Sequence, residues 1–180
     1  MKDGFLLIDK QVDWTSRDIC NKASHLLGIK KVGHSGTLDP FATGLLSLAF
    51  GNASKAIPYL EELDKTYIAE LSLGKKTNTA DLTGDVIKAA TYEHVTKELV
   101  KETLASFIGK QSQVPPMTSA IHVNGQKLYE LAHKGIEVER KPRDIEVFEI
   151  ILISFEGDKI IFSAKVSKGT YLRTLGEDIA

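Results

Sequence analysis

The chain has 180 residues, of which 42% are hydrophobic and 26% charged, and its net charge is −1. This composition supplies enough apolar side chains for a folded core and excludes a disordered or collagen-like chain. The single cysteine, Cys20, excludes an intramolecular disulfide, and no apolar run has the length of a membrane span. Acidic residues near the N-terminus argue against a signal peptide, so we expect a cytoplasmic protein. A length of 180 residues suits one domain, or one domain with a small appendage.

The first segment of the chain predicts a strand followed by a capped helix. Residues 4–10 (GFLLIDK) form a short apolar run that is typical of a buried strand. A helix is expected over residues 17–27, with Thr15 or Ser16 as its N-cap and Gly28 as its end. A glycine-rich loop follows this helix.

The middle of the chain predicts two further strands and a long polar loop. Residues 45–50 (LLSLAF) are an apolar run that indicates a strand, and Asn52 can cap a helix that Pro58 bends or shortens. Residues 65–73 alternate apolar and polar side chains, which predicts a half-buried strand. Residues 75–85 (KKTNTADLTGD) are polar and rich in turn formers, and predict a long loop.

The last third of the chain mixes hairpins with helices. Its predicted elements are a helix over 96–108 capped by Thr96 and closed by Gly109, an Asn-Gly hairpin over 120–128, a short helix over 128–134, strands over 144–155 and 159–167, and a helix from 169 onward. Strands and helices do not alternate regularly, so the fold class is α+β with a mostly antiparallel sheet. No repeat or linker divides the chain.

One carboxylate, Asp39, lies in the glycine-rich stretch 32–46 (VGHSGTLDPFATGLL). Pro40 pushes Asp39 toward an extended backbone, and the glycines of the loop permit tight turns and close approach of a ligand. From local chemistry alone, an Asp-Pro pair most often satisfies a turn. Zinc-ligand spacing, a Walker loop, a dinucleotide fingerprint and a G-x-S-x-G elbow are all absent from the sequence.

Three other residues carry chemistry that the sequence leaves open. Arg173 falls in the first turn of the last helix, where it is either functional or an ordinary surface arginine. Tyr67 on the strand over 65–73 is either a site residue or a core aromatic. Cys20 lies in a helical pattern, and we interpret it as a small core residue rather than a nucleophile.

Charges are distributed unevenly along the chain. Residues 110–143 hold six basic and three acidic side chains, whereas residues 61–102 hold six basic and nine acidic ones. A chain with this distribution can present a basic face to nucleic acid. Charge alone favours the simpler interpretation of a solvated surface.

Five sequence blocks, in order along the chain, resemble the TruB-type tRNA pseudouridine synthases. They are GFLLIDKQVDWTS, GHSGTLDPFATGLL, DKTYIAELSLGKKTNTADLTGD, QVPPMTSAIHVNGQKLYELAHKGIEVERKPR and SKGTYLRTLGEDIA, which together cover nearly all of the chain. The resemblance implies the α+β pseudouridine synthase fold. In that fold a mixed, mostly antiparallel sheet is flanked by helices, with a central RNA-binding cleft.

The same resemblance implies isomerisation of the T-loop uridine at position 55 of tRNA to pseudouridine. The target nucleotide is flipped out, the bond between N1 and C1′ is broken, and the rotated uracil is rejoined through C5. Family members use neither a metal nor an organic cofactor. The resemblance implies the tRNA T-stem-loop as the partner and no membrane contact. We expect a monomer.

The resemblance also assigns roles to residues. Asp39 matches the catalytic aspartate, which either attacks carbon or takes a proton from the ribose. Arg173 matches the charged partner of that aspartate, and Tyr67 matches the tyrosine that stacks on the target base. Six further residues match positions near the substrate: Lys10, His34, Gly36, Thr37, Asp81 and Tyr171.

The resemblance ends where family members continue. We therefore expect residues 1–180 to be a catalytic domain that is incomplete at its C-terminal end and lacks the family's C-terminal RNA-binding domain. An alternative function follows from this expectation. The chain would then be a tRNA-binding or tRNA-folding module whose catalysis is weak or lost through truncation.

Overall fold

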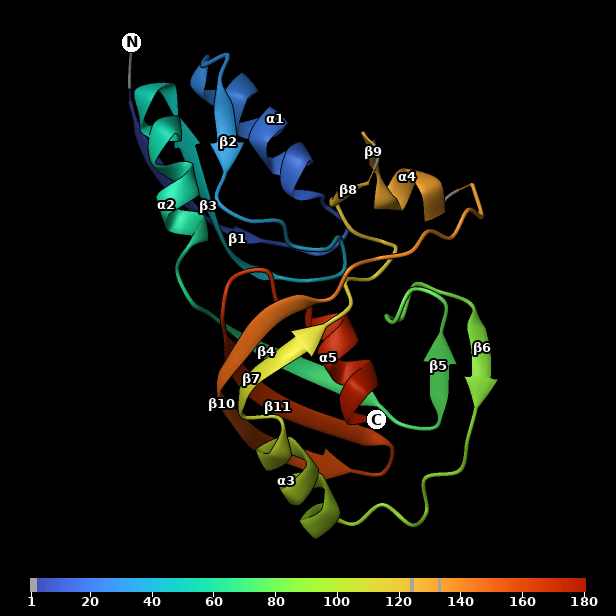
Figure 1. The fold of residues 1–180 in the computed structure, drawn as a ribbon. Helices are drawn as coiled ribbons and strands as arrows, with labels where there is room; N and C mark the ends of the chain where they lie inside the picture. Colours follow the sequence, from blue (N-terminus) through green and yellow to red (C-terminus); the bar gives the residue numbers. More distant parts are fainter. Residues whose placement is uncertain (1–2, 124, 133) are drawn as a thin grey trace. The chain divides into compact units, whose positions relative to one another are not determined.

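The computed structural model in Figure 1 describes residues 3–123, 125–132 and 134–180. It contains two compact units, Met1–Leu63 and Asp64–Ala180, and each is described by itself. No linker in the sequence predicts this division into two units. The assignment of residues 1–180 to one catalytic domain stays a prediction.

Unit one is built on a small antiparallel sheet. Its elements in chain order are β1 (Gly4–Lys10), α1 (Ser16–Leu27), β2 (Val32–His34), β3 (Gly44–Phe50), the 3₁₀ helix η1 (Gly51–Ala56) and α2 (Ile57–Glu61). The strand order is β1-β3-β2, so β3 is the central strand. Side chains of α1 and β3 form its core: Cys20, Ala23, Leu46 and Leu48.

The predicted helix is confirmed as α1, because the residues that cap it lie within it or next to it in the sequence. The Thr15 side chain accepts a hydrogen bond from the Asp18 backbone, and the Asp18 carboxylate accepts one in return. Gly28 ends the helix in the left-handed conformation, with φ of 65°. Cys20 is 2% exposed, and burial raises the pKa of its thiol, so it is the core residue that the sequence predicted.

The prediction that Asn52 caps a helix is wrong. The segment after β3 begins as a 3₁₀ helix without a side-chain cap, and Pro58 lies in the first turn of α2. Asn52 instead binds Asp3: its backbone N–H and its side-chain amide both donate to the Asp3 carboxylate, at 2.7 and 3.0 Å. A tertiary contact near the start of β1 therefore replaces the local cap.

Unit two contains the larger sheet. Its elements are β4 (Lys65–Ser72), β5 (Lys75–Thr77), β6 (Val86–Ala89), α3 (Lys97–Ser106), β7 (Gly109–Gln113), β8 (His122–Val123), β9 (Gln126–Lys127), α4 (Leu128–Ala132), β10 (Arg143–Glu156), β11 (Lys159–Val166) and α5 (Leu172–Ile179). The main sheet has the order β4-β11-β10-β7, and β5-β6 and β8-β9 are separate hairpins. Every strand pair found in the described residues is antiparallel.

One face of the main sheet packs against two helices. Val100 and Leu104 of α3 and Leu175 of α5 belong to the same buried cluster as the inward side chains of β4, β10 and β11. Burial along β4 alternates residue by residue, as the sequence predicted. This packing fixes α5, and with it Arg173, on the sheet.

Several predicted boundaries in unit two need correction. The loop over 75–85 is shorter than expected, because Lys75–Thr77 pairs with Val86–Ala89 as a hairpin. The strand Gly109–Gln113 was missed because it is polar and gains its order from pairing with β10. The last helix begins at Leu172 rather than near 169. The hairpin over 120–128 is confirmed, although Asn124 lies outside the described residues.

In the described part of the chain, no helix is long and apolar enough to cross a membrane. The same residues contain no group of three or more His, Cys, Asp or Glu side chains that could hold a metal ion.

Candidate active site

The backbone on both sides of Asp39 is held by buried contacts within unit one. Ser16, in the first turn of α1, is 2% exposed. Its hydroxyl accepts from the Leu38 N–H at 2.9 Å and donates to the Leu38 carbonyl at 3.2 Å. On the other side, the Pro40 carbonyl accepts from the backbone N–H of Asp13 at 2.9 Å. The half-buried Asp39 is thus mounted on a backbone that α1 and the preceding loop hold in place.

Lys10, the last residue of β1, is fully buried beneath this loop. Its ammonium group donates to three carbonyl oxygens, those of Gln11 at 3.0 Å, Trp14 at 2.8 Å and Pro40 at 3.1 Å. These bonds use all three of its donors. Burial lowers the pKa of Lys10, and the negative charges of Asp39 and Asp13 oppose that shift. Lys10 therefore braces the loop and puts a positive charge near Asp39, while its contact with substrate stays a prediction.

The other predicted residues of the loop lie at the end of β2 and directly after it. His34 ends that strand opposite Leu48. Its Nδ1 is buried and makes no hydrogen bond within the described residues. Gly36 is half-buried and Thr37 is exposed, while the neighbouring Ser35 N–H donates to the Ser47 carbonyl at 3.0 Å. The loop is therefore anchored to β3 at its start, and its imidazole Nδ1 has no hydrogen-bond partner among the residues that the structure describes.

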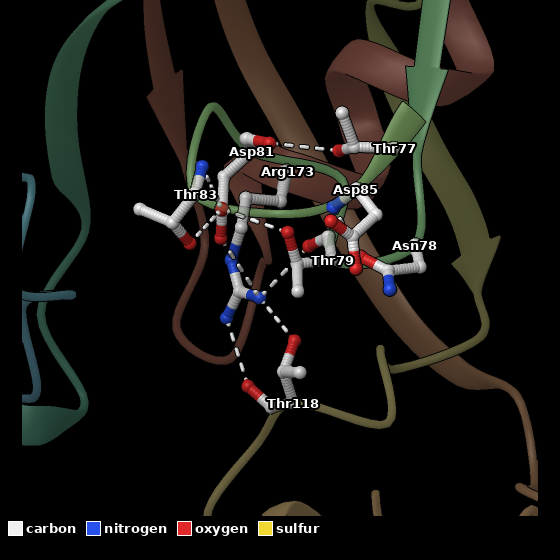
Figure 2. Close-up of polar contacts among 8 residues, drawn as sticks. All are labelled: Thr77, Asn78, Thr79, Asp81, Thr83, Asp85, Thr118 and Arg173. Atoms are coloured by element: carbon white, nitrogen blue, oxygen red, sulfur yellow. Dashed lines mark hydrogen bonds and ion pairs between the residues drawn. The ribbon is translucent and has the colours of Figure 1, made fainter. Parts of the chain in front are cut away.

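Arg173 lies in the first turn of α5, and its side chain is only 9% exposed. The guanidinium donates to the Thr118 carbonyl at 2.9 Å, to the Thr118 hydroxyl, and to the Thr79 carbonyl at 3.2 Å. An Asp81 carboxylate oxygen lies 3.7 Å from Nη1. Figure 2 shows Asp81 beside the Arg173 guanidinium. Arg173 therefore joins three segments of unit two and is not a surface arginine.

Asp81 is the centre of a compact polar loop between β5 and β6 (Figure 2). Its Oδ1 accepts from the Thr79 hydroxyl at 2.8 Å, the Thr83 N–H at 2.9 Å and the Thr83 hydroxyl at 2.5 Å. A Cβ added to Gly84 would lie 2.2 Å from the Thr79 hydroxyl oxygen, so only glycine fits there. The loop thus holds Asp81 in a fixed position beside Arg173.

The sequence placed Asp81 near the RNA and did not link it to Arg173. No local sequence pattern predicts this ion pair, because its two residues come from a loop and a helix that are far apart along the chain. Whether Asp81 also contacts RNA stays a prediction.

Tyr171 connects α5 to the sheet through a residue that the sequence analysis missed. The Gln113 side chain accepts from the Tyr171 N–H at 2.9 Å and donates to the Tyr171 carbonyl at 3.2 Å. Gln113 ends β7 and is 4% exposed. This pair of bonds fixes the start of the helix that carries Arg173. A polar strand residue gives no sequence signal for such a role.

Tyr67 lies on β4 opposite Ala164 and packs, half-buried, against the core cluster of unit two. Tyr67, Asp81, Tyr171 and Arg173 therefore belong to one unit, and Lys10, His34, Gly36, Thr37 and Asp39 to the other. The predicted pairing of Arg173 with Asp39 joins residues of different units, and it stays a prediction.

The basic stretch over 110–143 forms a pocket of about 250 Å³ in unit two. Arg140, Lys141 and Arg143 line it together with His122 and Glu139. Arg140 is tied down by bonds to the Pro115 carbonyl at 3.1 Å and to Glu137 at 3.0 Å. The fold therefore gathers part of this basic stretch on one surface.

Several curated bacterial proteins are similar to this chain over almost its whole length. It is 47% identical over 177 residues to a tRNA pseudouridine synthase B of Geotalea uraniireducens. It is 48% identical to that of Geobacter sulfurreducens and 49% to that of Dechloromonas aromatica. Each alignment covers 98% of this chain but only 57–59% of the relative. The chain thus spans somewhat more than half of the length of these proteins.

A solved structure shares the fold. The crystal structure of a Cbf5-Nop10-Gar1 complex contains a chain that is 27% identical, with a TM-score of 0.74, over 98% of this chain and 43% of its own. The predicted α+β fold of antiparallel sheets and helices is confirmed by this likeness. The family model described as TruB family pseudouridylate synthase (N terminal domain) matches residues 24–172. Because that match covers well over half of the sequence, the chain belongs to the TruB family of pseudouridylate synthases.

Proposed function

We propose that this chain carries the catalytic residues of a tRNA pseudouridine synthase that isomerises the T-loop uridine at position 55. The observation that carries the proposal is the construction of the Asp39 loop, where Ser16, Asp13 and Lys10 hold the backbone on both sides of a half-buried carboxylate. Family membership and relatives named tRNA pseudouridine synthase B support the same activity. An ordinary Asp-Pro turn needs no buried lysine and no buried serine.

In this proposal Asp39 acts as an ionised carboxylate. It either attacks carbon covalently or removes a proton from the ribose, and both steps need the charged form. A nearby cation favours that form. The buried ammonium of Lys10 supplies one such charge within unit one. Arg173 would supply a second, with Asp81 and Thr118 orienting its guanidinium for the carboxylate.

The target base must leave the folded T-loop before it can react. Flipping a nucleotide costs a few kcal/mol, which contacts in the pocket must offset. The ring of Tyr67 would stack on the flipped uracil, since aromatic stacking supports an extruded base. The buried Nδ1 of His34, which accepts no hydrogen bond from any described residue, would face the RNA that the base has left. Gly36 and Thr37 would shape the loop that carries Asp39, and Tyr171 would lie near the substrate.

RNA binding would draw on the basic surface of unit two as well as on the loop over 33–43. Arg140, Lys141 and Arg143 are gathered at one pocket there. Cations of this kind neutralise phosphates and release counterions, so binding should weaken as salt rises. Substituting Arg143 by Glu should weaken binding and spare the chemical step for bound RNA.

The decisive experiment is tritium release from T-loop RNA labelled at uracil C5. The unsubstituted chain should release tritium, and Asp39→Asn should release none while keeping its thermal unfolding midpoint. Asp9→Asn is a matched control, because Asp9 is an exposed carboxylate of β1 in the same unit. Comparable product formation by Asp39→Asn over long incubation would remove Asp39 from the mechanism.

The alternative is a tRNA-binding or tRNA-folding module whose catalysis is weak or lost. It predicts salt-dependent binding of T-loop RNA by the unsubstituted chain and little or no tritium release at saturating protein. The same assay therefore separates the two functions.

A further inference from the structure

The start of α5 is not fixed by its own sequence. Tyr171 is the N-cap residue, and its side chain makes no capping hydrogen bond. The starts of α1 and α3 are instead capped by the hydroxyls of Thr15 and Thr96, which accept from backbone N–H groups. The position of Arg173, two residues after Tyr171, therefore depends on contacts from elsewhere in unit two.

Two of these contacts come from Gln113, the last residue of β7. Its side-chain amide accepts from the Tyr171 N–H at 2.9 Å and donates to the Tyr171 carbonyl at 3.2 Å. The same carbonyl accepts from the Leu175 N–H at 3.0 Å, which is the first hydrogen bond of the helix. An amide that bonds to both polar groups of one residue fixes its orientation as a neighbouring strand would. Gln113 thus replaces the missing cap.

Thr118, which follows Gln113 in the same segment, holds the other end of the arrangement. Its carbonyl and hydroxyl oxygens accept from the Arg173 guanidinium (Figure 2). The segment 113–118 therefore contacts α5 at two points, the backbone of Tyr171 and the side chain of Arg173. Together the two points define where the guanidinium lies relative to the helix start, which neither would do alone.

The segment 113–118 is itself restrained. Pro115 and Pro116 fix two of its φ angles. Strand β7, which ends at Gln113, is paired with β10, and the Pro115 carbonyl accepts from Arg140 at 3.1 Å. Gln113 is only 4% exposed, so water competes little for its hydrogen bonds. The segment can therefore serve as a firm template for the start of α5.

We propose that Gln113 is a positioning residue for the reaction. It locks the start of α5 to the segment whose other end holds the guanidinium, and so sets where Arg173 presents its charge. The inference rests on the proposed function, in which that charge favours the ionised form of Asp39. A positioning residue differs from a merely structural one in its effect, because its loss slows the chemical step and leaves RNA affinity unchanged.

The test compares Gln113→Met with Gln111→Met in the 180-residue chain. Methionine has a similar length and makes neither of the two hydrogen bonds. Gln111 is the matched control, because it lies on the same strand and its side chain donates to the Phe107 carbonyl at the end of α3. Thr118→Val is a further variant, which removes the hydroxyl bonded to Arg173 and keeps the shape of the side chain, and Thr118→Ser restores that hydroxyl.

Single-turnover tritium release at saturating protein measures the chemical step. We expect Gln113→Met and Thr118→Val to slow it about ten- to hundredfold, because a small displacement of a catalytic group has an effect of that size. Thr118→Ser should recover most of this loss. Gln111→Met should keep the original rate even where it lowers the unfolding midpoint. Affinity for a labelled T-stem-loop RNA should be the same in every variant.

A second measurement does not depend on turnover. The guanidinium protons of Arg173 can be followed by NMR in arginine-labelled protein and assigned through Arg173→Lys. Their exchange with water should become about ten- to hundredfold faster in Gln113→Met and Thr118→Val, because a hydrogen bond to a charged group is lost or loosened. It should stay slow in Gln111→Met.

Failure of this inference can be distinguished from failure of the proposed function. Absence of tritium release by the unsubstituted chain would contradict the proposed catalysis, and proton exchange at Arg173 would still decide the positioning. Unchanged exchange or an unchanged rate in Gln113→Met, or an equal loss in Gln111→Met, would overturn the role of Gln113. Where Gln113→Met does not fold, Gln113→Glu gives the same comparison, since it keeps the acceptor for the Tyr171 N–H and loses the donor.

Discussion

At the scale of single residues, the two proposed catalytic groups are held by unlike means. The Asp39 loop is fixed through its backbone, by a serine hydroxyl, a lysine ammonium and a main-chain N–H. Arg173 is fixed through its side chain, by carbonyl and hydroxyl oxygens and by the Asp81 carboxylate. A carboxylate that must change partners during a reaction gains from a firm backbone. An arginine that must present a fixed charge gains from a firm guanidinium.

The first residue-scale prediction concerns Ser16. Ser16→Ala removes the hydroxyl that accepts from the part-buried Leu38 N–H and should lower the free energy of unfolding by about 1–3 kcal/mol. Turnover should fall by up to about a hundredfold, because a small displacement of Asp39 misaligns the reaction. Urea unfolding and single-turnover kinetics measure the two effects. Ser106→Ala is the control, since Ser106 is exposed at the end of α3 and should change neither quantity.

The second concerns Asp81. Asp81→Asn keeps the shape of the loop but removes a negative charge 3.7 Å from Arg173, where both side chains are only 9% exposed. We expect a loss of about 2–3 kcal/mol in the free energy of unfolding, because a buried cation loses a charged partner. Asp85→Asn is the matched control, since Asp85 bonds to Asn78 only through its backbone and its side chain is exposed. Equal stability of the two variants would show that Asp81 does not hold Arg173.

At the scale of elements, helix ends and hairpins position the site. The capped start of α1 carries Ser16 to the Asp39 loop, and the start of α5 is held by Gln113 beside Arg173. Helix α3 has a simpler cap, in which the Thr96 hydroxyl accepts from the Leu99 N–H at 3.2 Å. The N-caps of α1 and α3 therefore differ in the hydrogen bonds that the Asp18 carboxylate accepts, which α3 lacks.

This difference predicts a pH dependence. The hydrogen bonds from the Thr15 side chain and backbone lower the pKa of Asp18 below its ordinary value of 3.8. A carboxyl group with a lowered folded-state pKa stabilises the fold above its ordinary pKa, and this contribution disappears as the pH falls through the folded-state value. Thr15→Ala should therefore cost about 1 kcal/mol near neutral pH and less near pH 3. Thr96→Ala should cost a similar amount at both values, because Leu99 does not titrate. Thermal unfolding at both pH values gives the comparison.

At the scale of the whole molecule, the chain carries every residue that the family resemblance assigns to catalysis, yet it spans under two thirds of its curated relatives. Helix α5 bears Arg173 and ends at Ile179, one residue before the last. Leu175 of α5 is buried in the core cluster of unit two, so the packing of α5 positions Arg173. Residues that pack on α5 would therefore act on the proposed site.

We predict that residues 1–180 turn over more slowly than a chain extended with the matching C-terminal segment of the Geobacter sulfurreducens relative. A firmer α5 should hold Arg173 better, and the effect on rate can reach about a hundredfold. Single-turnover kinetics at saturating protein removes any difference in RNA affinity from the comparison. Equal rates would mean that the active site is complete within residues 1–180 and that the remaining segment serves binding alone.

Local sequence determined much of this protein. The caps at Thr15 and Thr96, the left-handed Gly28, the alternation along β4 and the hairpin of β10 and β11 follow from interactions between residues close in sequence, so they could be predicted from the chain. The α+β class followed from their order. The motif blocks, among them those around Asp39 and Arg173, predicted the family, because they occur along the chain in the same order as in the family.

Tertiary structure alone decided what surrounds the candidate residues. The burial of Lys10, the ion pair of Asp81 with Arg173 and the two hydrogen bonds between Gln113 and Tyr171 all join segments distant in sequence. Contacts between distant segments also explain why Asn52 binds Asp3 and does not cap a helix, and why the polar strand β7 is ordered. Propensity and spacing act over a few residues, whereas these contacts depend on which surfaces the folded core brings together.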